Sequence, residues 1–136
     1  MRLTDAEVRW LRQWNLIDEN VEVHEVQLHI GGAMGYYLKL TNHGAITTGD
    51  HIWFKTESRR NNVALLVHEL VHVAQYRRMG KTRFLVDYLA GTLKRRGYSR
   101  EHPLEAPAYA RQDQAKAIVK EHGGPPAEAT CPRPPP

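Results

Sequence analysis

The pentapeptide HELVH at residues 68–72 constrains this chain more than any other part of its sequence. It lies in a run from residue 63 to residue 79 that contains no proline or glycine, and its neighbours on both sides are uncharged. Two histidines four residues apart on a helix share one face, with Cβ atoms about 6 Å apart. Both imidazoles can therefore reach one Zn²⁺ through bonds of about 2.0–2.1 Å. The run predicts a buried helix that stops at Gly80 and supplies two metal ligands, His68 and His72.

The glutamate inside this motif indicates catalysis. Glu69 follows the first histidine and lies about 100° further around the helix. From there a carboxylate can take a proton from a zinc-bound water, whose pKa the metal lowers towards 7. A metal site that serves only stability needs no such base. The motif therefore favours Glu69 as the catalytic residue of a zinc-dependent hydrolase.

A catalytic zinc needs a third protein ligand besides the two histidines. The extension that would supply a histidine six residues after His72 is absent, because Gln75 and Arg78 occupy the positions of its glycine and histidine. We therefore expect the third ligand farther along the chain. Our choice is Glu105, 33 residues after His72, near the start of the last predicted helix. This would be the His₂Glu arrangement of gluzincins, in which a glutamate on a later helix completes the site.

The sequence leaves several roles around this predicted site unassigned. Pro107 is expected to delay or bend the last helix, and His102 and Asp87 are weaker alternatives to Glu105 as ligand. An oxyanion would need a hydrogen-bond donor besides the metal, and the sequence does not rank the candidates Tyr109, Tyr98 and His102. Residues 51–55 lie where an edge strand could pair with an extended substrate, although core packing explains this strand equally well.

The order of predicted elements indicates an α+β fold. A capping-box pattern at Thr4 and Glu7 predicts an N-terminal helix, and a zincin-like domain is expected over residues 1–121. Proline-rich residues 122–136 are predicted to be a disordered tail. Short strands are predicted at 21–30, 36–40 and 45–55, the last broken at Gly49-Asp50, and three helices at 63–79, 82–95 and 103–121.

The composition limits which classes of partner are expected and which residue types can bind the metal. The single cysteine, Cys131, excludes an intrachain disulfide and a cysteine-based zinc site, so histidines and carboxylates must hold the metal. No apolar run approaches the roughly 20 residues that span a bilayer, and no signal peptide is evident. We therefore expect no membrane partner and a cytoplasmic location, with signal-independent export left open. The net charge is +4, but the arginine pairs at 59–60, 77–78 and 95–96 are expected to be solvated helix ends, so nucleic acid is an unlikely partner.

Two segments together resemble a known family. Residues 44–54 read GAITTGDHIWF and residues 65–75 read LLVHELVHVAQ, a strand pattern T-x-G-x-x-I-x-F followed by a helix pattern L-L-x-H-E-L-x-H-x-x-Q. These patterns resemble the eCIS-core domain, a metallopeptidase domain associated with extracellular contractile injection systems, and the resemblance covers about residues 20–76. It implies a zincin-like fold, zinc ligands at His68 and His72, Glu69 as general base, and a contractile injection or phage-like system as a candidate partner. The family pattern ends in two glutamines where this chain has Gln75-Tyr76.

Two hypotheses of function follow from these observations. In the first, the protein is a zinc metallopeptidase that hydrolyses peptide bonds in a protein or peptide substrate, with Glu69 activating the water. In the second, it is a zinc-stabilised interaction or cargo domain with little or no catalytic activity, since small domains gain folding free energy from a bound metal.

Overall fold

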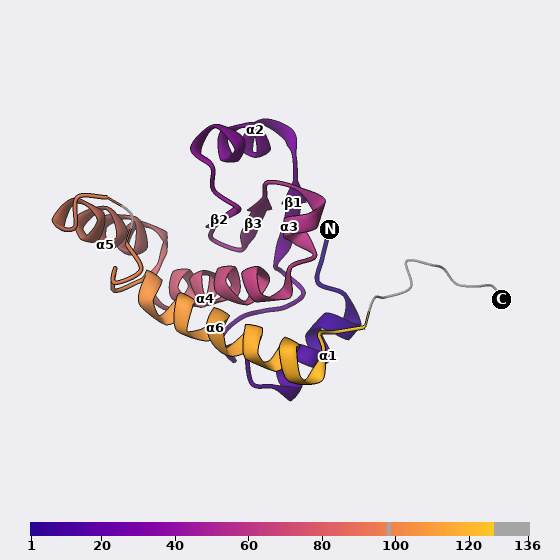
Figure 1. The fold of residues 1–136 in the computed structure, drawn as a ribbon. Helices are drawn as coiled ribbons and strands as arrows, with labels where there is room; N and C mark the ends of the chain where they lie inside the picture. The colour runs from indigo at the N-terminus through magenta and orange to yellow at the C-terminus, as the bar shows by residue number, and fades with distance from the viewer. Residues whose placement is uncertain (98, 127–136) are drawn as a thin grey trace.

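The protein has an α+β fold, as predicted, in which one buried helix lies between a small sheet and a second long helix (Figure 1). The computed structural model describes residues 1–97 and 99–126. The predicted oxyanion candidate Tyr98, Cys131 and most of the predicted proline-rich tail lie outside these described residues. The elements in chain order are α1 (Asp5–Gln13), β1 (Gln27–Ile30), α2 (Gly32–Thr41), β2 (Ala45–Thr48), β3 (His51–Phe54), α3 (Glu57–Arg60), α4 (Val63–Met79), α5 (Lys81–Lys94) and α6 (Glu105–His122).

Helix α4 carries the HELVH motif and forms the centre of the molecule, with the predicted boundaries confirmed. The side chain of Asn62 caps its first turn by accepting a hydrogen bond from the backbone N–H of Leu65 at 3.2 Å. Gly80 ends it with a positive φ of 85°, a conformation that favours glycine. The helix is buried almost all round from Ala64 to Tyr76, which fits its apolar sequence.

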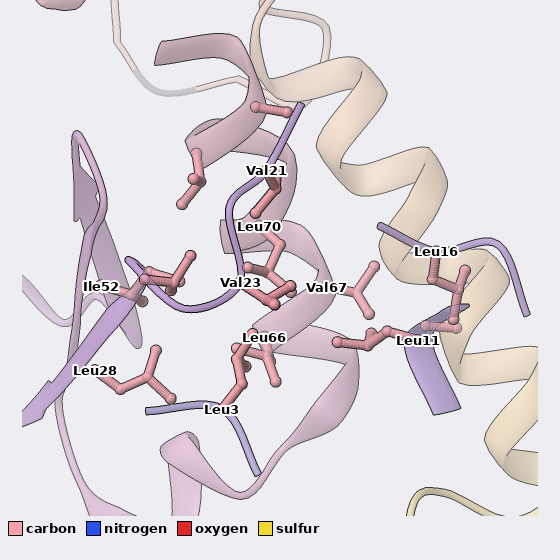
Figure 2. Close-up of a cluster of buried hydrophobic side chains, with 14 of the residues drawn as sticks. Leu3, Leu11, Leu16, Val21, Val23, Leu28, Ile52, Leu66, Val67 and Leu70 are labelled. Atoms are coloured by element: carbon pink, nitrogen blue, oxygen red, sulfur yellow. The ribbon is translucent and has the colours of Figure 1, made fainter. Parts of the chain in front are cut away.

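The main hydrophobic core lies around α4 (Figure 2). Leucines and valines of α4 meet side chains from α1, the sheet and the segment between them, including Leu11, Val23, Leu28 and Ile52. Residues 21–26 were predicted to begin the first strand. Instead they form an irregular segment, and β1 starts at Gln27. The alternating valines of this segment signalled burial correctly, because Val21, Val23 and Val26 belong to the core.

The sheet has the strand order β1-β3-β2, with β1 parallel and β2 antiparallel to β3. The predicted break at Gly49-Asp50 is the turn of the β2–β3 hairpin, and Gly49 has a φ of 62°. The central strand is therefore β3, so the prediction that residues 51–55 form a substrate-pairing edge is wrong. Phe54 is fully buried, while Trp53 faces the other side and stacks on His29 at 4.0 Å.

Residues 36–40, predicted as a strand, belong to helix α2. The reason is topological. The chain leaves β1 at one edge of the sheet and enters β2 at the other edge, so it must pass the end of β3, a distance of about 10 Å. Helix α2 makes this crossing, and it ends at Asn42, whose left-handed backbone conformation (φ 57°) closes the helix. Only Gly35 and Leu38 of this helix are buried.

A largely buried ion pair joins α1 to α3. The capping box predicted at Thr4 and Glu7 is confirmed, and the Glu7 carboxylate also accepts two hydrogen bonds from the Arg60 guanidinium, at 2.7 and 2.9 Å. Arg60 is only 6% exposed, so the expectation of solvated arginine pairs at helix ends is wrong for this residue. Arginines 59, 60, 77 and 78 do lie in last helical turns, as expected.

This pair makes stability depend on acid pH. Burial alone would raise the pKa of Glu7, but hydrogen bonds from Arg60 and Thr4 and the charge of Arg60 outweigh it, so the net pKa is lowered. Its contribution to stability is therefore present above the carboxyl group's unfolded pKa and lost as the pH falls through the lower folded pKa. Arg60→Met should lower the free energy of unfolding at pH 7 by on the order of 3 kcal/mol, because it strands the Glu7 carboxylate.

Denaturant titrations of the wild type and of Arg60→Met, at pH 7 and at pH 3, measure this effect. The difference between the two proteins should be smaller at pH 3 than at pH 7, because Glu7 takes up a proton more readily as the pH falls, above all in the variant, where Arg60 no longer lowers its pKa. Arg83→Met is the matched control, since it breaks an exposed pair with Asp87 (2.9 Å) and should change stability by less than about 1 kcal/mol. A difference that stays constant with pH would contradict the account.

Among residues 1–97 and 99–126, none of the helices combines the length and the apolar character that a membrane span requires.

Candidate metal centre

Three side chains from two helices converge on one point. His68 and His72 project from α4, and Glu105 is the first residue of α6, which packs along α4. One Glu105 carboxylate oxygen, Oε1, lies 3.0 Å from Nε2 of His68 and 3.2 Å from Nε2 of His72. All three residues are buried, with 4–6% of each exposed. The structure thus brings together the three residues that the sequence nominated as ligands.

The sequence of α6 explains how Glu105 reaches α4. Glu105, Ala108, Gln112 and Ala115 recur at helical spacing and share one face. The two alanines are fully buried, and their small size lets the helices approach closely. Pro107 does not delay the helix as expected, because it lies in the first turn, where a missing N–H removes no helical hydrogen bond.

A second layer of side chains fixes the orientation of both imidazoles. Gln112 Oε1 lies 2.7 Å from Nδ1 of His68, and Gln75 Oε1 lies 2.8 Å from Nδ1 of His72. Gln75 donates its own N–H to the backbone oxygen of Leu104 at 3.0 Å, so its oxygen must be the atom that faces His72. An amide oxygen only accepts, so Nδ1 of each ring is the donor in these contacts, and each Nε2 faces Glu105. This Nε2 donates to the carboxylate when the ring is protonated and has a free lone pair when the ring is neutral.

This arrangement fits a bound cation. When both rings are neutral, two lone pairs and a carboxylate oxygen face one another, and they repel unless a positive charge lies between them. In a tetrahedral site with bonds of about 2.0 Å, ligand atoms lie about 3.3 Å apart, close to the 3.0 and 3.2 Å separations here. The ligand atoms of the three residues all lie within 4.8 Å of one another. Two imidazoles and one carboxylate, with outer-shell partners on both rings, form a donor set typical of catalytic zinc sites.

The charge of the site is set by Glu105. Burial would raise its pKa, but hydrogen bonds from His68, His72 and Tyr88 lower it far below the usual range, so the carboxylate stays ionised. The Tyr88 hydroxyl donates to Oε2, the oxygen that does not face the histidines. Burial lowers the pKa of His72, but the hydrogen bond to Glu105 and the charges of Glu69 and Glu105 outweigh it and raise the pKa. The pocket therefore has an electrostatic preference for a cation.

A residue of the sheet orients the catalytic candidate Glu69. Its carboxylate accepts a hydrogen bond of 2.8 Å from the hydroxyl of Thr47 in β2, and both residues are buried. Glu69, Thr47 and the three metal-ligand candidates all line one cleft of about 350 Å³. Helix α4 and strand β2 form two walls of this cleft, and Phe84 of α5 and Tyr37 of α2 contribute to the others. The carboxylate and the candidate ligands thus share one space that opens to solvent.

The structure places both alternative ligand candidates, His102 and Asp87, outside the cluster. Both ring nitrogens of His102 are engaged, with Nε2 2.8 Å from the backbone oxygen of Tyr88 and Nδ1 accepting from the N–H of Leu104 at 3.0 Å. Asp87 lies on the outer face of α5, paired with Arg83 at 2.9 Å. Neither is part of the His68–His72–Glu105 cluster. Of the oxyanion candidates, Tyr109 packs its ring edge-on against His68 at 4.5 Å, with Arg100 over its face at 4.2 Å.

His102 has a different role, which is to pack the segment before α6 against α5. Its ring stacks on Tyr88 at 4.4 Å and presses against Gly91, where an added Cβ would meet Nε2 at 2.5 Å. Only glycine leaves room for this ring. The packing sets the position of Tyr88, and Tyr88 in turn donates to Glu105.

Sequence reasoning missed the supporting residues Thr47, Gln75, Tyr88 and Gln112. Two of them belong to the family patterns: Thr47 is the threonine of the T-x-G-x-x-I-x-F pattern, and Gln75 is the final glutamine of the helix pattern. Gln112 lies seven residues after Glu105, two helical turns along the same face, and could have been found from that spacing. Tyr88 carried no signal beyond its place on a predicted helix.

Gln112 provides a test of the second layer. Gln112→Leu should weaken Zn²⁺ affinity about 10- to 100-fold, because His68 loses the acceptor that fixes its tautomer. Gln112→Glu should retain affinity, since a carboxylate also accepts. Gln114→Leu, the same change on an exposed part of the same helix, is the control. Competition with a chromophoric chelator measures the affinities, and equal values for the two leucine variants would contradict the assignment.

Comparison with known protein families covers one part of the candidate metal centre. Residues 19–80 match the family model of the eCIS core domain. The match spans the sheet and α4 and so contains His68, Glu69 and His72 together with Thr47 and Gln75, but it ends before Glu105, Tyr88 and Gln112. No curated protein and no solved structure matches the chain. This part of the chain is therefore similar to the eCIS core domain, and the remainder of the site is described from the structure alone.

Proposed function

We propose that the protein is a zinc-dependent metallopeptidase of gluzincin type, with His68, His72 and Glu105 as metal ligands and Glu69 as general base. The observation that carries this proposal is the convergence of both Nε2 atoms on Glu105 Oε1 in a cleft that Glu69 also lines. A metal site without a hydrolytic role would gain nothing from a buried carboxylate beside its ligands, because burying a charge costs free energy.

The chemistry divides between the metal and the chain. A bound Zn²⁺ would polarise the scissile carbonyl and make the attacking water more acidic. Glu69 takes a proton from that water and then passes it to the leaving amine. Thr47 holds the Glu69 carboxylate towards the cleft through the 2.8 Å hydrogen bond. Glu105 stays anionic, and Gln75 and Gln112 keep both imidazoles in the tautomer that has its lone pair on Nε2.

Strand β2 supports a peptide as the substrate. One of its edges pairs with β3, and within the described residues no strand pairs with the other edge. Ala45, Ile46 and Thr47 of this strand also line the cleft. An extended peptide could add to such an edge through main-chain hydrogen bonds, which would bring its backbone in front of Glu69. The substrate edge is thus β2 in this proposal, in place of the residues 51–55 expected from the sequence.

A metal-stabilised interaction or cargo domain is the second candidate. One observation favours it: the three ligand candidates join α4 to α6, so a bound metal would cross-link two helices of a small domain. For either candidate, the similarity to the eCIS core domain supports an extracellular contractile injection system as the associated assembly.

Metal removal separates the two candidates. Chelation should abolish cleavage of a mixed peptide library, and stoichiometric Zn²⁺ should restore it. Chelation should also lower the free energy of unfolding by about 4 kcal/mol relative to protein in Zn²⁺ at 1,000 times the dissociation constant. Mass spectrometry of the library and thermal unfolding supply the two readouts. A loss of stability with no cleavage at any metal concentration would favour the interaction domain.

A further inference from the structure

The exposed apolar side chains of this protein are concentrated on two helices. Apart from Met1, the large apolar residues that are exposed within the described chain all lie on α2 and α5, with exposed fractions from 48% to 70%. On α2 they are Tyr36, Tyr37 and Leu40. Single exposed apolar residues are ordinary, but a group of them marks a binding surface.

On α5 these residues form a stripe that the core does not use. Leu85, Val86, Leu89 and Leu93 fall within about 100° of the helix circumference, and we call them the α5 arc. The opposite side of the helix carries the buried residues Phe84 and Gly91. The helix is therefore apolar on two sides, and only one side faces the rest of the protein. The α5 arc is available to a second molecule.

The α5 arc is bordered by positive charge. Lys81, Arg83 and Lys94 are exposed on the same helix, and Arg96, also exposed, lies two residues after its end. Asp87 is the only acidic residue of α5, and it pairs with Arg83 at 2.9 Å. A second copy of this chain would bring these cations against one another, which is unfavourable. An occupant with negative charge at the ends of an apolar stretch would complement both features.

The α5 arc is also continuous with the candidate metal centre. Leu85 belongs to the arc and lines the cleft, and Tyr37 of α2 lines the same cleft. Figure 1 shows α2 over the sheet and α5 at one end of α4, with the β2 side of the sheet between them. A chain lying in the cleft can thus continue onto both apolar surfaces. A flat membrane could touch the two helices but would not enter between them.

We infer that the α5 arc and the exposed side of α2 form an exosite for an apolar polypeptide segment flanked by aspartate or glutamate. The inference rests on the proposed function, because it places this segment next to the bond that is cleaved. The substrate class is then a polypeptide with an accessible apolar stretch, as in an unfolded or loosely folded chain. The tyrosines of α2 suit this role, because tyrosine is enriched at protein interfaces.

Binding can be tested without cleavage. The Zn²⁺-loaded Glu69→Gln protein is titrated against a fluorescein-labelled peptide that has six apolar residues between pairs of glutamates, and fluorescence anisotropy is recorded. Adding Leu89→Asn and Leu93→Asn should weaken binding at least about tenfold, because both leucines lose their apolar contacts. These positions are 59% and 70% exposed, so the fold should tolerate the change. Gln114→Asn with Ala117→Asn, on the exposed side of α6, is the matched control and should bind within twofold of the parent.

Three further probes complete the test. A peptide with lysine in place of glutamate should bind more weakly, and added salt should reduce that difference. Unchanged affinity in the Leu89→Asn/Leu93→Asn variant would overturn the exosite. Binding to vesicles of anionic phospholipid without any binding to the peptide would also overturn it. The same holds if sedimentation shows a mass that doubles as the protein concentration rises and this variant stays a monomer.

Experiments can overturn the exosite and leave the hydrolytic function standing, or the reverse. If the Glu69→Gln protein binds the glutamate-flanked peptide but the wild type never cleaves it, the exosite stands and the hydrolytic function is overturned. If the wild type cleaves the peptide and the Leu89→Asn/Leu93→Asn variant has unchanged KM and kcat, hydrolysis stands and the exosite is overturned.

Discussion

Glu69→Gln should lower kcat/KM for peptide hydrolysis by about 10²- to 10⁴-fold, the contribution of a general base in enzymes. The amide can still accept the hydrogen bond from Thr47, so the side chain should keep its place, but it cannot take a proton from water. Zn²⁺ affinity should remain within a few-fold of the wild type, because Glu69 is not among the three residues of the cluster. Cleavage of a library-derived peptide and a Zn²⁺ competition titration measure the two quantities.

Glu121→Gln provides the control for this substitution. It makes the same chemical change at an exposed residue near the end of α6 and should leave both quantities unaltered. If Glu69→Gln keeps full activity, the general base must be another residue. If it loses zinc together with activity, Glu69 acts through the metal site, and the proposed division of roles is wrong.

Glu105→Gln should reduce Zn²⁺ affinity by more than about 100-fold, which is the upper end of the effect of outer-shell residues. The amide keeps the shape of the side chain but removes the negative charge that faces both Nε2 atoms. The loss of zinc should remove hydrolysis as well. Isothermal titration calorimetry with Zn²⁺ and the peptide assay provide the readouts.

Glu101→Gln is the matched control, four residues earlier and exposed, where only a hydrogen bond with Ser99 is affected. Zn²⁺ affinity should not change in this variant. Full Zn²⁺ affinity in Glu105→Gln would exclude the His₂Glu arrangement. A variant of His102 should not mimic Glu105→Gln in metal titrations of folded protein, because both of its ring nitrogens are already engaged.

The parts of the fold that the sequence predicted well are those with local physical signals. The bounds of α4 follow from a run without proline or glycine between Asn62 and Gly80, and the β2–β3 hairpin follows from Gly49 in its turn. The start of α1 follows from the Thr4–Glu7 capping box. In each case the signal lies within a few residues of the feature that it predicts.

The failures are features that depend on distant parts of the chain. Residues 36–40 have the composition of a strand, but the sheet topology requires a crossing there, and a helix supplies it. The alternation in residues 51–54 identified a strand correctly, but alternation cannot tell a central strand from an edge. Arg60 looked like an ordinary helix-end arginine, and only the fold brings it to Glu7, 53 residues away.

The same distinction applies to the candidate metal centre. His68, Glu69 and His72 were nominated from one short motif, while Glu105 required an argument about how a later helix returns to the first. The structure brings Glu105 to the two histidines, and their role in metal binding stays a prediction. The contribution of Tyr88 could not have been found in advance, because it depends on the packing of His102 against Gly91.

The helices differ in how deeply they are buried, and this difference affects how the sequence of the protein can evolve. Three of the four candidate site residues, His68, Glu69 and His72, lie on α4, the most deeply buried helix, where most substitutions would cost stability. The outer surfaces of α2 and α5 support almost none of the core, so replacing their exposed residues costs little. Sequence drift can therefore remodel what the cleft admits while the reactive centre stays fixed. Relatives that share the HELVH helix would then be expected to differ most in the two helices beside the cleft.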